Sequence, residues 1–248
     1  SIEEPKSWVL DYFFKFPFWG FVFLVFQSII FFLIIDVLRL LLFPFYRKSR
    51  DKIKRLQAGI VILLTVFFII YIPARIVYDW NTVNVNEYEL VKADLPDELD
   101  NFKIVFFSDL QADRFTERDR LVRYLSKVNE QNPDLILAGG DFITDSPNYI
   151  DTAAVYAGRL NSKYGIYSCV GDHDQWAYGR QIEKSRNEVT EKLAAKGIKM
   201  LHNDTLSIKI DSAEIFTTFV TNTYSVKTSS KLIDSLSSNA KDAALRIF

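Results

Sequence analysis

Two long apolar runs dominate the first third of the chain. Residues 17–35 and residues 56–74 each contain 19 consecutive residues without a charged side chain. At about 1.5 Å per helical residue, each run would span about 28 Å, close to the roughly 30 Å hydrocarbon core of a bilayer. Tryptophan and tyrosine residues gather near the ends of both runs, as they do at membrane–water interfaces. The pattern predicts a two-helix membrane anchor over residues 17–80, preceded by an interfacial segment over residues 1–16.

Two other structures could account for such apolar runs. A pair of buried core helices would have a similar composition, whereas a signal peptide would carry a single and shorter run. The connecting segment, residues 46–55, contains six lysine and arginine residues, against three in the outer flanks. Because short basic loops stay on the cytoplasmic side, we expect this loop in the cytoplasm and the rest of the chain on the other side. The predicted location is the cell membrane, with a multi-pass anchor and an extracytoplasmic domain.

The pattern changes after residue 80 to short apolar strands that alternate with amphipathic helices. The alternation predicts a right-handed parallel sheet, followed by an antiparallel pair, in one domain over residues 81–248. The predicted elements are strands at 103–108, 134–138 and 165–170, helices at 117–130, 150–160 and 183–196, and the antiparallel pair at 205–210 and 214–220. In open sheets of this kind, ligands bind outside the carboxyl ends of the strands.

Composition and charge exclude several classes of protein. The first 79 residues carry 10 basic and 6 acidic side chains, net +4, and the remaining 169 carry 20 and 25, net −5. An acidic domain lacks the basic face that nucleic-acid binding requires, so we expect no nucleic-acid partner. A single cysteine excludes an intrachain disulfide and a cysteine-based zinc site, and two histidines exclude a site built mainly from imidazoles.

Carboxylates follow three successive predicted strands. Asp109 ends the first strand region, Asp141 the second and Asp172 the third. A single aspartate there is often only a helix cap, but the carboxyl ends of parallel strands meet at one edge of a sheet. Three like charges so close require compensation, and divalent cations supply it. The glycines before Asp141 and Asp172 would let the backbone approach a ligand closely.

These residues carry a resemblance to a known family. Asp109-x-Gln111, Gly140-Asp141 and Gly171-Asp172-His173-Asp174 resemble the first three motifs of the calcineurin-like metallophosphoesterases, in the membrane-associated branch. The resemblance covers about residues 86–248 and implies an α/β fold, with two N-terminal transmembrane helices followed by a metallophosphoesterase-type α/β/β/α sandwich. The chain lacks an initiator methionine and ends at Phe248, inside an apolar run typical of a beginning strand. We therefore expect a fragment that stops before the family's C-terminal histidine motifs.

The resemblance also implies roles for individual residues. Asp109 and Gln111 would ligate the first metal, Asp141 would bridge both metals, and Asp172 would bind the second. His173 would stabilise the phosphoryl oxygens or protonate the leaving group. The cofactors would be two divalent metal ions, with Mn as the first choice and Fe, Zn or Mg as alternatives, because oxygen donors predominate. The activity would be hydrolysis of a phosphate ester by a hydroxide that the two metals activate.

The motifs also depart from the family pattern. Gln111 stands where the family has a histidine ligand, Asp172 replaces an asparagine, and Thr144 replaces the second aspartate of the Gly-Asp motif, with Asp145 one residue later. Such changes fit either a metal site of this subfamily or the loss of one.

Three functions therefore remain open. The leading hypothesis is a membrane-anchored phosphoric ester hydrolase, with the lipid bilayer as a partner and a phosphate ester, including one carried by a lipid, as substrate. The alternative is a catalytically silent member of the fold that acts as a membrane-bound binding or scaffold protein. A third is that the two helices mainly mediate membrane assembly.

Four further residues each have a structural and a functional interpretation. His202 is typical of a turn or surface residue rather than a metal ligand, and Cys169 of a small buried hydrophobe. Trp176 could line a substrate pocket or cover the site. Asp113 could be an alternative ligand or a cap before Thr116.

Overall fold

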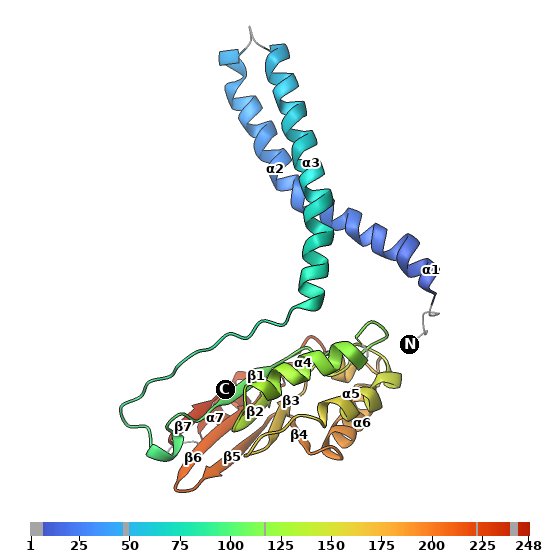
Figure 1. Ribbon diagram of the computed structural model, residues 1–248. Coiled ribbons are helices and arrows are strands. Elements are labelled where there is room, and N and C mark those ends of the chain that lie inside the picture. Colours follow the sequence, from blue (N-terminus) through green and yellow to red (C-terminus); the bar gives the residue numbers. More distant parts are fainter. Residues whose placement is uncertain (1–6, 47–49, 117, 222, 239–242) are drawn as a thin grey trace. The chain divides into compact units, whose positions relative to one another are not determined.

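The computed structural model contains two compact units, residues 2–84 and residues 85–248 (Figure 1). The described residues are 7–46, 50–116, 118–221, 223–238 and 243–248. Residues 1–6 of the predicted interfacial segment and residues 47–49 of the basic loop lie outside the described residues.

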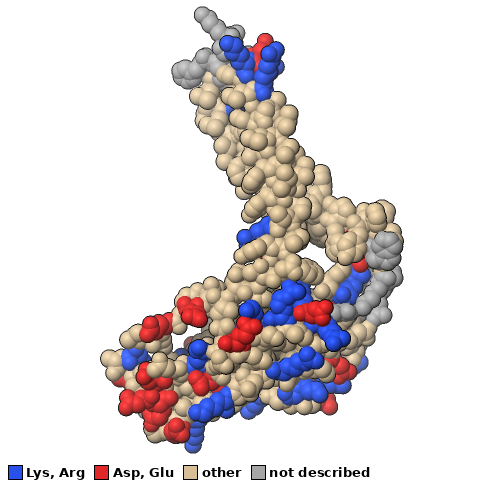
Figure 2. All heavy atoms as spheres, in the orientation of Figure 1, with Lys and Arg blue, Asp and Glu red and all other residues tan. Residues whose placement is uncertain are grey.

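The first unit consists of long helices that contain both apolar runs. Its elements are α1 (Trp8–Leu10), the π-helical turn η1 (Asp11–Lys15), α2 (Phe16–Tyr46) and α3 (Arg50–Asn81). Two stretches, Asp11–Leu42 and Asp51–Asn81, are long and apolar enough to cross a membrane, and only 6% and 11% of their most apolar windows are buried. Figure 2 shows an almost unbroken uncharged surface along these helices. Such exposed apolar surface is untypical of core helices of a soluble protein and fits candidate membrane spans.

Helices α2 and α3 pack through a narrow strip of side chains. Ser28 on α2 is buried, and Phe68 and Ile72 on α3 are buried as well. The rings of Phe31 and Phe68 lie 5.6 Å apart between centroids. The hydroxyl of Ser28 donates a hydrogen bond to the carbonyl of Leu24, one turn earlier. The small serine, whose hydroxyl is satisfied within its own helix, lets the larger side chains meet across the hairpin.

The second unit begins with a four-stranded parallel sheet in the order β1-β2-β3-β4. Its strands are β1 (Ile104–Phe107), β2 (Leu135–Ala138), β3 (Ile166–Cys169) and β4 (Ile198–Leu201). The connecting helices are α4 (Arg118–Glu130), α5 (Ile150–Ala157) and α6 (Ile182–Ala194). Single helical turns lie at η3 (Asp97–Leu99), η4 (Pro147–Tyr149) and η5 (His173–Gln175). The predicted parallel sheet is confirmed, and its carboxyl ends share one edge.

Strand β2 shows how two layers cover the sheet. Ile136 and Ala138 belong to the core shared with α4, α5 and α6, whereas Leu135 and Leu137 belong to a second core on the opposite face. That second core includes residues of a further sheet, ordered β5-β6-β7. Its strands are β5 (Asp204–Ile210), β6 (Ala213–Phe219) and β7 (Leu245–Ile247), and α7 (Ser230–Ser238) lies between the last two in sequence. The predicted fold class, two long apolar helices followed by a metallophosphoesterase-type α/β domain, is confirmed.

The structure differs from the sequence prediction in three elements. Helix α5 ends at Ala157 rather than at residue 160, because the amides of Arg159 and Leu160 turn back to the carbonyls three residues earlier. Strand β4 and helix α7 were not predicted. The four residues of β4 are too few for their periodicity to distinguish strand from helix, and α7 is also short, at nine residues.

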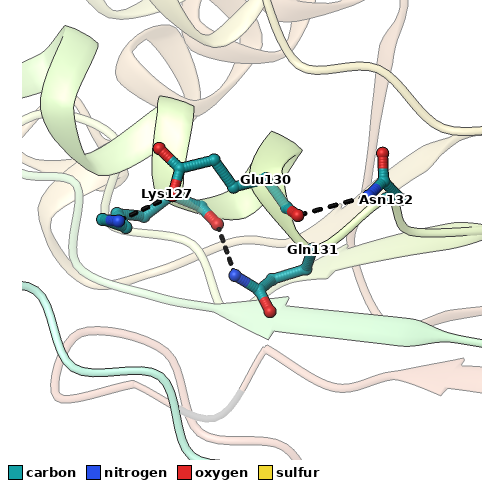
Figure 3. A network of polar contacts seen from close by, with 4 residues as sticks. All are labelled: Lys127, Glu130, Gln131 and Asn132. Atoms are coloured by element: carbon teal, nitrogen blue, oxygen red, sulfur yellow. Dashed lines mark hydrogen bonds and ion pairs between the residues drawn. The ribbon is translucent and has the colours of Figure 1, made fainter.

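Helix α4 ends in a small polar network that starts the turn into β2 (Figure 3). Lys127 pairs with Glu130 at 2.6 Å, and the Gln131 side chain donates to the carbonyl of Lys127 at 3.2 Å. Asn132 takes a left-handed conformation with φ +50° and donates its side-chain amide to the carbonyl of Glu130 at 3.3 Å. Asparagine tolerates this conformation better than most residues, so the chain can reverse here into β2.

We predict that Leu121→Ala destabilises the second unit by about 2–5 kcal/mol, because Leu121 is 0% exposed beneath the parallel sheet and its truncation leaves a cavity. Urea unfolding of the full chain in detergent micelles measures the change. Val155→Ala, at a position that is 47% exposed on α5, is the control and should cost far less. Equal losses in the two variants would contradict the assigned core.

Candidate functional site

The loops that follow β1 and β2 run side by side beyond the ends of the strands. The amide of Gln111 donates to the carbonyl of Asp141 at 2.8 Å, and the amide of Ala112 donates to the carbonyl of Phe142 at 2.9 Å. The amide of Asp109 reaches the carbonyl of Gly140 at 3.3 Å. Backbone pairing therefore continues into the loops and brings the first two predicted motifs together.

Three of the predicted site residues have left-handed backbones. Asp109 has φ +59°, Gln111 has φ +44° and Asp141 has φ +58°. This conformation costs about 1–2 kcal/mol for residues other than glycine, and aspartate is among those that tolerate it best. Such residues concentrate at functional sites, where the surrounding structure holds them in place.

Gly140 and Gly171 bring the loops after β2 and β3 into direct contact. A Cβ atom at Gly140 would lie 2.3 Å from the amide nitrogen of Gly171, and one at Gly171 would lie 2.1 Å from Oδ1 of Asp141. Gly140 also has φ +86°. The sequence predicts that these glycines let the backbone approach a ligand closely, whereas in the structure the space that each leaves is filled by the neighbouring loop.

Asp174 joins the same two loops through its side chain. It is 0% exposed, and its carboxylate accepts hydrogen bonds from the amides of Phe142 at 2.8 Å, Asp141 at 2.9 Å and Gly171 at 3.0 Å. Burial raises the pKa of Asp174 to about 6, against the lowering effect of its amide donors. This role was not predicted from the sequence, where the only signal is an acidic residue that ends the third motif, three residues after a glycine.

Asp141 is the electrostatic centre of the site. Burial raises its pKa, and the carboxylates of Asp109 and Asp172 raise it further, while the amide of His173 donates to its Oδ1 at 2.8 Å and lowers it. The charges of Asp109 and Asp172 therefore reach Asp141 across this edge of the sheet. The excess negative charge at this edge is the condition that a bound cation relieves.

Two contacts fix the His173 ring, one with the backbone of Thr144 and one with the ring of Trp176. Its Nδ1 contacts the carbonyl of Thr144, and because a carbonyl only accepts, Nδ1 carries the proton. The ring of Trp176 lies 4.6 Å from the histidine ring between centroids. Thr144, which replaces the family's aspartate, thus orients His173 through its backbone. Nε2 is the nitrogen left for a substrate.

The predicted metal ligands fit divalent cations in their chemistry. Asp109, Gln111, Asp141 and Asp172 offer hard oxygen donors, which suit Mn²⁺ and Mg²⁺. Among the described residues, however, no three histidine, cysteine, aspartate or glutamate side chains are arranged so that they could hold an ion. Gln111 instead directs its Nε2 towards Oδ1 of Asp109, at 3.4 Å. Metal binding would require side-chain rotation within a backbone that is already in place.

Asp113 and His202 have structural roles. Oδ1 of Asp113 accepts the amides of Phe115 and Thr116, at 2.7 and 2.6 Å, so the capping interpretation is confirmed. His202 follows β4, with Nδ1 at 2.9 Å from the Thr221 hydroxyl and Nε2 at 3.1 Å from the Arg186 guanidinium. Burial and then Arg186 lower its pKa. With both nitrogens engaged, His202 is not a metal ligand in this arrangement.

Cys169 lies within β3 and is partly buried against the second core. Burial, followed by the charges of Asp174 and Asp141, raises the pKa of its thiol to about 11. The thiol therefore stays protonated at neutral pH, which supports the interpretation of Cys169 as a packing residue rather than a nucleophile.

The parallel sheet, with Asp109, Asp141, Asp172 and His173 in the loops beyond its carboxyl ends, defines an α/β protein whose candidate site lies where such sheets bind their ligands. The family model described as calcineurin-like phosphoesterase matches residues 102–236, more than half of the chain. The chain therefore belongs to the calcineurin-like phosphoesterase family.

Several relatives share this region. The chain is 31% identical over 119 residues to a transmembrane protein with metallophosphoesterase domain from Danio rerio, covering 48% of this chain and 26% of the relative. It is 32% identical over 177 residues to the metallophosphoesterase YkuE of Bacillus subtilis, covering 66% and 59%. It is 31% identical over 98 residues to the UDP-2,3-diacylglucosamine pyrophosphatase LpxG of Chlamydia muridarum, covering 38% and 29%. The chain thus matches between about a quarter and three fifths of the length of these relatives.

We predict that Asp174→Asn destabilises the second unit by about 1–3 kcal/mol, because an amide cannot accept all three backbone donors that the buried carboxylate satisfies. Denaturant unfolding of the full chain measures the loss. Asp145→Asn is the matched control, at an exposed position beside the second motif. If the two variants lose equal stability, Asp174 does not hold the loops together.

Proposed function

We propose that the chain is part of a membrane-anchored, metal-dependent phosphoesterase. The observation that carries the proposal is the half-buried Asp141, whose pKa burial and the charges of Asp109 and Asp172 raise and whose Oδ1 accepts the amide of His173. Family membership supports phosphoester hydrolysis as the reaction class. The two candidate membrane spans, together with relatives named as transmembrane proteins, support a membrane anchor.

In the proposed mechanism, some residues bind the cations and His173 transfers a proton or stabilises the phosphoryl oxygens. Asp109, Gln111, Asp141 and Asp172 would hold two divalent cations, with Mn the first choice. Such a pair supplies Lewis acidity and an activated water for in-line attack on phosphorus. His173, fixed by its contact with Thr144, would direct Nε2 towards the phosphoryl oxygens or the leaving group. Asp174 joins the loops that carry Asp141 and His173, which would hold these two side chains in fixed positions.

A lipid-carried phosphate ester is the substrate class that we favour. A domain tethered to a bilayer is concentrated near lipid head groups. One relative is named a UDP-2,3-diacylglucosamine pyrophosphatase, a name that describes an acylated substrate with phosphate linkages. Both observations favour a phosphate ester at the membrane over a freely diffusing one.

The silent-scaffold alternative rests on Gln111. Its amide nitrogen, rather than its oxygen, faces Asp109, and the described residues hold no ready-made group of ion-binding side chains. A member of the fold that has lost metal binding would still keep the Asp174 contacts and the parallel sheet. Metal binding by the intact protein therefore separates the two functions.

We predict that the full-length protein hydrolyses bis(p-nitrophenyl) phosphate or p-nitrophenyl phosphate only with added divalent metal. Asp141→Asn should lower turnover by about 100-fold or more, because it removes the central carboxylate. Asp151→Asn, on α5 where Asp151 pairs with Lys192, is the matched control and should retain activity. Activity that survives exhaustive chelation would exclude the metal mechanism, and absence of both activity and metal binding would favour the scaffold.

We predict that the basic loop is cytoplasmic and that the second unit is not, because the loop carries six basic residues against three in the flanks. The test uses two variants, each with a single cysteine: Ser49→Cys or Asn148→Cys, both in a Cys169→Ala background. A membrane-impermeant maleimide is added to intact cells, and labelling of the introduced cysteine shows that it faces outward. The Asn148→Cys protein should react and the Ser49→Cys protein should not. The opposite labelling pattern would mean that the topology is inverted.

A further inference from the structure

The loop between β6 and α7 is closed at its base by hydrogen bonds. This loop, residues 221–228, is described except for Asn222. The amide of Thr221 donates to Oδ1 of Asn203 at 2.9 Å, and the hydroxyl of Thr228 donates to the carbonyl of Thr221 at 2.6 Å. The Thr221 hydroxyl also contacts His202 at 2.9 Å. The Thr228 hydroxyl also lies 3.0 Å from Oδ1 of Asn203, so both ends of the loop are fixed to the turn that follows β4.

The tip of the loop is a compact turn. The amide of Thr223 donates to the carbonyl of Val226 at 2.8 Å, and the amide of Val226 donates to the hydroxyl of Thr223 at 3.0 Å. The Thr223 side chain is buried, whereas the Tyr224 side chain is 85% exposed. The turn thus presents the backbone of Tyr224 in a set position, while the tyrosine ring projects into solvent.

Three hydrogen bonds join this tip to the third motif and to the two residues that follow it, Gln175 and Trp176. The amide of Tyr224 donates to Oδ1 of Asp172 at 2.7 Å. The indole Nε1 of Trp176 donates to the hydroxyl of Ser225 at 3.0 Å, a second contact one residue further along the loop.

The third bond comes from Gln175, whose Nε2 donates to the hydroxyl of Thr223 at 3.1 Å and to the carbonyl of Gly171 at 3.1 Å. Gln175 is fully buried. One buried side chain therefore ties the loop to the backbone immediately before Asp172.

We propose that Thr221 and residues 223–228 are a positioning element for the candidate site, which holds the Asp172 carboxylate for cation binding and Trp176 against His173. The inference rests on the proposed metal site. A charged acceptor suits this position, because the Tyr224 amide dipole stabilises the extra negative charge that aspartate brings where the family has asparagine. Hydrogen bonds to ligating carboxylates raise cation affinity by fixing their orientation. The backbone of Tyr224, rather than its side chain, performs this role.

A proline substitution tests the backbone contact directly. Tyr224→Pro removes the amide donor to Asp172, whereas Tyr224→Ala keeps it and removes only the exposed ring. Calorimetric titration of Mn²⁺ into the full chain in detergent micelles should show about 10-fold weaker binding for Tyr224→Pro. Tyr224→Ala should bind as the wild type does. Thermal unfolding without metal shows whether either variant has lost its fold.

A second pair of variants keeps the test decisive if the proline variant does not fold. Ser225→Ala and Trp176→Phe each remove the same hydrogen bond, worth about a 3- to 10-fold change in affinity if it orients the loop. The double variant should bind Mn²⁺ no more weakly than either single variant, since both act through one contact. The fluorescence of Trp176 should also change in Ser225→Ala, because the indole donor loses its partner.

The outcomes separate this inference from the function on which it rests. If the wild type binds no Mn²⁺, the metal site and the positioning role both fail. If the wild type binds Mn²⁺ and Tyr224→Pro binds it equally or more tightly, only the positioning role is overturned. If Tyr224→Pro is unfolded, unchanged Mn²⁺ affinity in Ser225→Ala overturns it instead.

Discussion

The buried carboxylate of Asp174 is the contact on which the candidate site depends. It accepts amides from the loops after β2 and β3, and a Cβ atom on Gly140 or Gly171 would keep those loops apart. A buried carboxylate is costly, and here its charge is spread over three donors. Because Asp141 sits on one of these loops and His173 on the other, both take their positions from this contact. The loop after β1 joins the same assembly through backbone pairing with Asp141 and Phe142.

Much of the architecture could be predicted from hydrophobic patterning, because long apolar runs and alternating strands and helices have distinct periods. The three strand-end aspartates could be placed at one edge because parallel strands share their polarity. The role of Asp174 could not be predicted, because it depends on hydrogen bonds to Asp141 and Phe142, which lie 33 and 32 positions earlier in the sequence. The left-handed backbones of Asp109, Gln111 and Asp141 could not be predicted either, because neither aspartate nor glutamine requires that conformation.

The departures from the family pattern are less disruptive in the structure than in the sequence. Thr144 lacks the carboxylate expected at its position, yet its carbonyl contacts His173 and its hydroxyl lies 3.2 Å from Asp113. Asp172 finds a backbone donor in Tyr224. Gln111 is the exception. It stands where the family has a histidine ligand, and its side-chain nitrogen donates a hydrogen bond to Oδ1 of Asp109. Of the three departures, Gln111 is therefore the one that bears most directly on the proposed metal site.

The backbone pairing between the strand-end loops also constrains the order in which the chain can fold. The contacts that join the three strand-end loops connect segments separated by an intervening helix, so the entropy of closing those segments must be lost first. The site can thus form only after β1, β2 and β3 have docked, late along the folding pathway. The two apolar helices have no such requirement, since their hydrogen bonds are local and they precede the domain in the chain. Insertion of the helices and assembly of the site are therefore separable events, and a defect in one need not arrest the other.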